Sequence, residues 1–138
     1  MNDHPDLAVA VARLAGLPLS RVVFGPGWVT LEFAGEYNAF LQVNTPIELK
    51  TPSTELVVFD PSRHSVQPAA SALVALRDAS VKVAEVSSEQ FSLTLVEGYE
   101  LRVMLDPTDF EPILFSGSHH MSPGQLSWHF VVTAGCAP

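Results

Sequence analysis

The chain has 138 residues and is 47% hydrophobic, which suits one domain, residues 1–138, with a core that needs no disulfide. Its net charge of −8 is uneven, since residues 1–82 hold eight acids and six bases, whereas residues 83–138 hold seven acids and one base, Arg102. Such a field disfavours nucleic-acid and anionic-membrane partners and favours a basic partner if the charges share one face; the alternative is an acidic surface that only keeps the protein soluble.

The start of the chain indicates no targeting segment. Residues 1–6 carry acids and a proline where a signal peptide carries lysine or arginine. The first apolar stretch, residues 7–19, is interrupted by Arg13, Gly16 and Pro18 and is shorter than the roughly 20 residues of a membrane span. We therefore expect a soluble cytoplasmic protein.

A short helix is predicted over residues 5–15. Asp3 suits the N-cap, Pro5 suits the first turn, and Gly16 ends the segment. Its apolar stripe consists of Leu7, Ala10, Val11 and Leu14. The hydrophobic period then changes to two over three runs separated by short turns, which predicts an antiparallel β-meander. These runs are residues 19–24, 29–33 and 37–43, with the turns Gly25-Pro26-Gly27 and Gly35-Glu36 between them.

The same order recurs in the second half. A helix is predicted over residues 68–78, opened by Pro68. Its stripe consists of Ala69, Ala72, Leu73 and Leu76, and the period-two runs that follow are residues 81–86, 91–95 and 99–105. Residues 14–43 align with residues 76–105 without a gap at an offset of 62 residues, which places Leu31 over Leu93 and Tyr37 over Tyr99. Beyond them, a one-residue shift places Ile47-Glu48 over Phe110-Glu111.

The expected fold is therefore α+β and strand-rich. It consists of two pseudo-repeats, residues 5–59 and 67–132, each with one short helix followed by an antiparallel β-meander. Chance agreement between two meanders is the alternative to duplication. Each half ends in one more predicted strand, residues 56–59 and residues 126–132. The lone cysteine, Cys136, lies near the chain end and is interpreted as incidental, because it lacks the setting that activates a thiol.

Histidines and acids are the candidates for chemistry. His119 and His120 are adjacent in a loop rich in Gly, Ser and Pro, and a metal role competes there with a simple exposed pair, because no motif supplies further ligands. His129 alternates with apolar neighbours, so we expect it on the outer face of a strand. The acids Asp106, Asp109 and Glu111 follow a strand without the pattern of a calcium loop.

No motif predicts a catalytic site. The chain has no GxSxG elbow for a nucleophilic serine. Gly25-Pro26-Gly27 lacks the context of a phosphate-binding loop and is interpreted as a hairpin turn. Trp28 precedes the inward-facing Val29, so it is a candidate for an outward-facing interface residue as well as for ordinary packing.

Several segments together resemble small bacterial families of unknown function. The residues that carry the resemblance are Leu73-Val74-Ala75-Leu76, the runs 81–86, 91–95 and 97–103, and the pair Phe110-Glu111. In these families a helix ending LxGxxV precedes LxLxFxDGxxLxV and an aromatic-Glu pair, and some members are suspected immunity proteins of contact-dependent or polymorphic toxin systems. The chain departs where Asp78 replaces the usual glycine and where Pro112 and Ile113 replace a small residue and a tryptophan.

The leading hypothesis is a non-enzymatic acidic interaction protein, similar to immunity-type proteins, that covers a surface of a basic partner such as a toxin. The expected partner-binding residues are Trp28, Glu97, Glu100, Asp109, Phe110 and Glu111. No cofactor and no metal are predicted. The alternatives are a small-molecule binding or catalytic domain with a pocket between the repeats, lined by His119, His120 and Glu111, and a structural homodimer.

Overall fold

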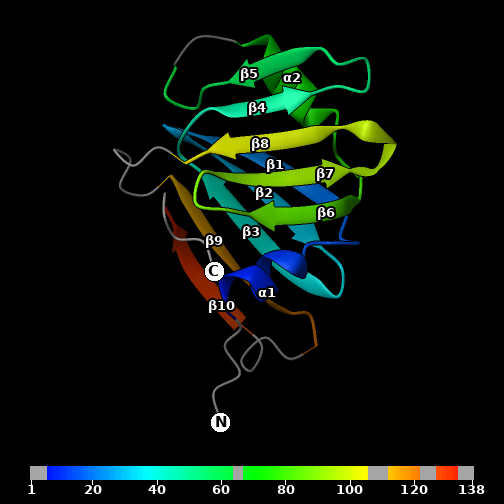
Figure 1. Cartoon of the computed structure of the whole chain (residues 1–138), viewed down its shortest axis with the longest axis vertical. Helices are drawn as coiled ribbons and strands as arrows, with labels where there is room; N and C mark the ends of the chain where they lie inside the picture. Colours follow the sequence, from blue (N-terminus) through cyan, green and yellow to red (C-terminus); the bar gives the residue numbers. More distant parts are fainter. Residues whose placement is uncertain (1–5, 64–66, 106–111, 122–126, 134–138) are drawn as a thin grey trace.

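The computed structural model describes residues 6–63, 67–105, 112–121 and 127–133. In this part of the chain the fold is α+β and strand-rich, with two antiparallel five-stranded sheets and two short α-helices. Figure 1 shows the two sheets as two layers, with the strands of one running across those of the other. The expectation of an α+β fold dominated by antiparallel strands is confirmed.

The strands of the first sheet lie in the order β1-β2-β3-β9-β10. They are β1 (Leu19–Gly25), β2 (Trp28–Ala34), β3 (Tyr37–Val43), β9 (Ile113–His119) and β10 (Ser127–Val132). The second sheet has the order β5-β4-β8-β7-β6. Its strands are β5 (Leu56–Phe59), β4 (Ile47–Lys50), β8 (Glu100–Met104), β7 (Gln90–Leu95) and β6 (Val81–Val86), and a 3-10 turn, η1 (Val96–Gly98), joins β7 to β8.

The two halves of the chain exchange strands. Each predicted meander forms three adjacent strands, β1-β2-β3 in one sheet and β6-β7-β8 in the other. The expected strands at the end of each half are present as β5 and β10. However, β4 and β5 join the sheet of the second half, and β9 and β10 join the sheet of the first half. Neither sheet is therefore made by one half alone.

Alternation along the strands separates the core from the outer faces. Leu31 pairs across the first sheet with Leu41, and Leu93 pairs across the second with Leu101, and all four are buried. The buried side chains of both sheets and both helices belong to one hydrophobic cluster. Burial of each such leucine stabilises the fold by about 1.5–3 kcal/mol.

Both helices are shorter than predicted. Helix α1 (Leu7–Ala12) begins after Asp6, whose carboxylate accepts a 2.9 Å hydrogen bond from the Val9 N–H; the N-cap is therefore Asp6 rather than Asp3. Helix α2 (Pro68–Val74) opens on Pro68 as predicted but ends four residues before Asp78. Neither helix is long and apolar enough to cross a membrane. In Figure 1, α1 lies beside β6 and α2 lies beside β5.

After each helix ends, a tight turn forms where the sequence predicts further helical residues. The Leu14 N–H bonds to the Val11 carbonyl at 3.0 Å, and the Leu76 N–H bonds to the Leu73 carbonyl at 3.1 Å. These three-residue spacings tighten the backbone as a 3-10 turn does. Leu14 and Leu76 are still buried, so the predicted apolar stripes are correct beyond the ends of the helices.

The chain segments that follow the two helices pair with each other. The Leu19 N–H donates to the Ala79 carbonyl and the Val81 N–H to the Leu17 carbonyl, both at 2.9 Å. The Gly16 N–H donates to the Val81 carbonyl and the Asp78 N–H to the Leu19 carbonyl, both at 2.7 Å. We name residues 16–19 and 78–81 the crossing segments, because they pair with each other and lead into the edge strands β1 and β6.

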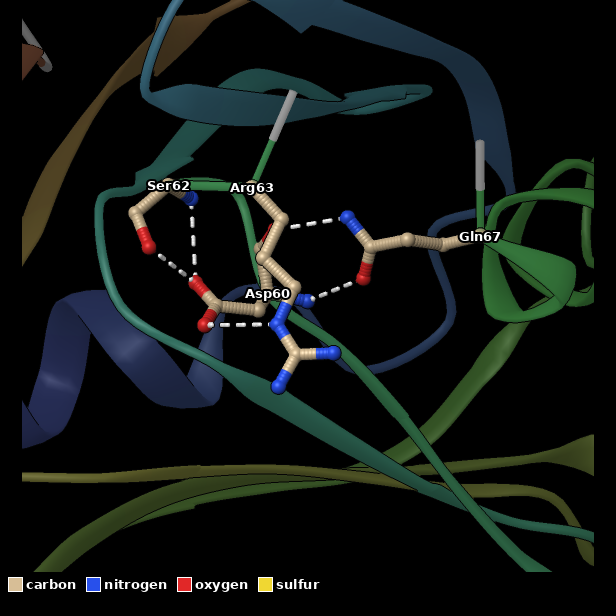
Figure 2. A network of polar contacts seen from close by, with 4 residues as sticks. All are labelled: Asp60, Ser62, Arg63 and Gln67. Carbon is tan, nitrogen blue, oxygen red and sulfur yellow. Dashed lines mark hydrogen bonds and ion pairs between the residues drawn. The ribbon is translucent and has the colours of Figure 1, made fainter. Parts of the chain in front are cut away.

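A polar network, drawn in Figure 2, fixes the connection from β5 to α2. The side-chain amide of Gln67 bonds to both backbone groups of Asp60, accepting from its N–H at 2.9 Å and donating to its carbonyl at 2.7 Å. The Asp60 carboxylate accepts from the Ser62 hydroxyl at 2.7 Å and from the Ser62 N–H at 3.0 Å. The two bonds from Ser62, together with the Arg63 guanidinium, hold the pKa of Asp60 below its ordinary value.

Because the pKa of Asp60 is lowered by folding, its charge stabilises the fold at neutral pH and this contribution is lost as the pH falls through the folded value. We predict that Asp60→Asn lowers the free energy of unfolding at pH 7 by about 0.5–1 kcal/mol. The difference from the natural chain should narrow below about pH 4. Urea unfolding at pH 7 and pH 3 measures both values, and an equal loss at the two pH values would show that the charge has no such role.

Candidate functional site

An aromatic cluster surrounds Tyr37 at the start of β3. The ring of His119 meets the Tyr37 ring edge-on at 5.3 Å, and the Trp128 ring lies 5.7 Å away. The guanidinium of Arg13, just after α1, lies 5.0 Å from the centre of the Tyr37 ring and 5.5 Å from that of Trp128. These distances are within the range of cation–π attraction.

Trp128 fits against the sheet because its neighbours are small. Trp128 on β10 lies opposite Gly117 on β9, and Gly117 lies opposite Ala39 on β3. A side chain at Gly117 would overlap the indole ring. The indole N–H of Trp128 and Nη1 of Arg13 are buried and have no hydrogen-bond partner within the described residues. Among the described residues, attraction to the two rings is thus the interaction that positions the Arg13 guanidinium.

The histidines take separate positions. His119 accepts a 3.1 Å hydrogen bond at Nδ1 from the Met121 N–H, and its Nε2 lies 3.9 Å from the Glu36 carboxylate. His120 and His129 are exposed, the latter on the outer face of β10 as expected. The described residues hold no group of three or more His, Cys, Asp or Glu side chains that could bind a metal. The adjacent histidines therefore do not converge on a common centre with other ligands in this part of the structure.

A groove of about 290 Å³ lies beside Tyr99, before β8. It is lined by residues 75–79, Val96, Glu97 and Tyr99. Two further cavities lie near the β6–β7 hairpin and between α1 and β6; Glu85 and Val86 line both of them. His119 and His120 line none of these three cavities.

The groove beside Tyr99 carries unpaired acidic groups. Asp78 and Glu97 are exposed, and neither forms an ion pair with a described residue. Both have left-handed backbones, with φ of 74° and 72°, which favour glycine and cost other residues of order 1 kcal/mol. Arg77 also lines the groove, so two carboxylates face one guanidinium there.

The structure places the expected partner-binding residues on more than one surface. Glu97 lines the groove, while Glu100 points from β8 and pairs with Arg102 at 3.1 Å. Trp28 belongs to the first sheet, where its half-buried indole covers Gly25 on the neighbouring strand. Asp109, Phe110 and Glu111 lie outside the described residues, as does Asp106.

Sequence reasoning missed Arg13 and the groove beside Tyr99. In the sequence, Arg13 stands out only as an interruption of an apolar stretch, and Asp78 as the end of the second predicted helix and a departure from a glycine. The offset of 62 residues does contain a signal, because it places Ala75 at the position of Arg13, and Asp78 and Glu97 at the positions of Gly16 and Gly35. From the first half to the second, the large Arg13 is thus replaced by the small Ala75. The two glycines are replaced by acids.

Comparison with known proteins finds no matching family model, no matching curated protein and no matching solved structure.

We predict that Arg13→Ala lowers the free energy of unfolding by about 1–2 kcal/mol, because it removes the cation from both rings. In a Trp28→Phe background, the emission of Trp128 should shift to longer wavelength as its ring becomes hydrated. The matched control is Arg77→Ala, which removes an exposed guanidinium and should change stability by less than about 0.5 kcal/mol. Equal effects of the two variants would contradict the role assigned to Arg13.

Proposed function

We propose that the chain is a non-enzymatic acidic interaction protein that binds a basic partner by covering part of its surface, as an immunity-type protein does. The observation that carries the proposal is the groove beside Tyr99, where the exposed carboxylates of Asp78 and Glu97 lack ion-pair partners among the described residues. Unpaired surface carboxylates attract a basic protein during encounter and are neutralised in the complex.

The backbone supports this assignment of the groove. Asp78 and Glu97 occupy left-handed conformations that glycine would adopt with less strain. Strained non-glycine residues are concentrated at functional sites, where the side chain is retained for its chemistry. Two such residues with the same charge line one groove, which favours a role for the charge itself.

We also propose that the chain consists of two pseudo-repeats related by the offset of 62 residues. The four hydrogen bonds between the crossing segments are equivalent in pairs at this offset. Both first strands carry an irregularity at the same place, between Leu19 and Arg21 and between Val81 and Val83. Each sheet also has the same composition, with three strands of one half and the last two of the other. These agreements are the support for duplication.

The small-molecule alternative would use the same groove, because His119 and His120 line none of the three cavities described above. At about 290 Å³, the groove is at the lower limit of the roughly 300–1,000 Å³ of ligand pockets. This size fits one side chain of a protein partner better than a complete cofactor.

The test uses the product of the gene next to the one that encodes this chain, because immunity proteins and toxins are produced as pairs. Asp78→Asn with Glu97→Gln should weaken binding about tenfold at low salt, at about 0.5–1 kcal/mol for each exposed charge. The matched control, Glu85→Gln with Glu89→Gln, removes the same charge at the β6–β7 hairpin and should have a smaller effect.

Titration calorimetry at several salt concentrations measures these affinities. Binding by the natural chain should weaken as salt increases, and the groove variant should show a smaller dependence. Absence of binding, binding that does not depend on salt, or equal losses in the two double variants would contradict the proposal.

A further inference from the structure

The contacts of Arg13 show that a guanidinium can be held against Tyr37 in this fold. Its guanidinium lies between Tyr37 and Trp128, at 5.0 and 5.5 Å from the ring centres. Nη1 is buried without a hydrogen-bond partner in the described part of the chain. The place beside Tyr37 is therefore filled by an arginine side chain that is held mainly by the aromatic rings.

The corresponding place beside Tyr99 is empty. Arg13 and Ala75 are the C-caps of α1 and α2, with φ and ψ of −67° and −14° for Arg13 and −64° and −15° for Ala75. Their side chains therefore leave the backbone in the same local geometry. Ala75 ends at Cβ, and it lines the groove of about 290 Å³ together with Tyr99.

The charges of the two places differ in a complementary way. Gly16 and Gly35 stand at the positions that correspond to Asp78 and Glu97. The internal arginine thus has no carboxylate at either position, whereas the empty groove has two. In the second sheet, Val57 holds the register position that Trp128 has in the first. The groove therefore offers one aromatic ring instead of two, together with two carboxylates.

We propose that the groove binds an arginine side chain of the partner, with its guanidinium over Tyr99 and its charge paired with Asp78 and Glu97. This rests on the proposed binding of a basic protein and names the group that enters. A guanidinium suits the place better than an ammonium, because it is planar, stacks on an aromatic ring and still donates hydrogen bonds at its edge. Arg77 is exposed at the groove and leaves a net negative charge for the incoming cation.

In the first test, the capped peptide acetyl-Gly-Arg-Gly-amide is added to the isotope-labelled full chain. The backbone amide signals of the protein are followed by NMR. The signals of Val96, Glu97 and Tyr99 should shift, and that of Tyr37 should not. The same peptide with lysine should bind several-fold more weakly, and the peptide with citrulline, which is neutral, should bind at least tenfold more weakly. Absence of shifts near Tyr99, or equal binding of all three peptides, would overturn the proposal.

Two variants locate the binding. Ala75→Arg should fill the groove from inside, as Arg13 fills its counterpart, and abolish peptide binding. Its matched control, Val74→Arg, adds the same charge one residue earlier, at an exposed position that does not line the groove. Peptide binding that Ala75→Arg leaves unchanged, or that both variants reduce equally, would contradict the proposal.

A third variant, with two substitutions, provides a test that does not depend on how Ala75→Arg folds. Asp78→Gly with Glu97→Gly introduces the residues of Gly16 and Gly35 and relieves two left-handed backbones. The double variant should have an equal or higher melting temperature and should lose at least tenfold in peptide affinity. Retained peptide affinity in this stable variant would also overturn the assignment.

The partner assay separates this inference from the proposed function. If the neighbouring gene product binds the Ala75→Arg variant as tightly as the natural chain, the arginine assignment fails and surface binding stands. If that gene product does not bind even the natural chain, while the peptide still shifts the signals near Tyr99, the immunity-type function fails and the arginine groove stands. Loss of both interactions in Ala75→Arg, with both retained in Val74→Arg, supports the two together.

Discussion

The pairing of the two crossing segments is the interaction on which the rest of the structure depends. Residues 16–19 and 78–81 exchange backbone hydrogen bonds of 2.7 to 2.9 Å, and Leu17, Leu19 and Val81 are buried beside them. Each segment links the end of a helix to an edge strand, β1 or β6, so this pairing fixes both helix ends relative to both sheets. It therefore also fixes Arg13 beside Tyr37 and Ala75 beside Tyr99. The turns that precede the two tyrosines differ, because Glu97 has a left-handed backbone, with φ of 72°, and Gly35 does not.

Exchange of strands extends this constraint to the whole chain. Each sheet takes its last two strands from the other half, so neither half can bury its apolar face without its counterpart. The edges of the meanders are covered in the same way, because β3 and β8 pair with β9 and β4 instead of ending each sheet. A surface feature of one half, such as the carboxylates of Asp78 and Glu97, can then differ from its counterpart without loss of the shared core. The proposed arginine groove is a difference of this kind.

The local structure could be predicted from the sequence and the long-range structure could not. Period-two runs and helical stripes identified the meanders and the buried faces, because Leu31 and Leu93 alternate with polar residues along their strands. Alternation specifies a face and not a partner, so the transfer of β4 and β9 to opposite sheets had no local signal. The helix ends were misplaced because the apolar stripe continues through Leu14 and Leu76 in tighter turns. The groove was missed because it depends on a side chain that is absent at Ala75, and residues 109–111, on which much of the expected site rested, lie outside the described structure.

Native-state hydrogen exchange tests the interlocked architecture most directly. If the crossing segments join the halves into one cooperative unit, the amides of Leu19 and Val81 should exchange only through global unfolding, with the same opening free energy as those of Leu31 and Leu93 in the inner strands β2 and β7. As the denaturant concentration increases, the opening free energies of all four amides should decrease along one common line. A lower opening free energy for Val81 and Leu93 than for Leu19 and Leu31, or the reverse, would show that one half opens while the other stays folded, and would contradict the account.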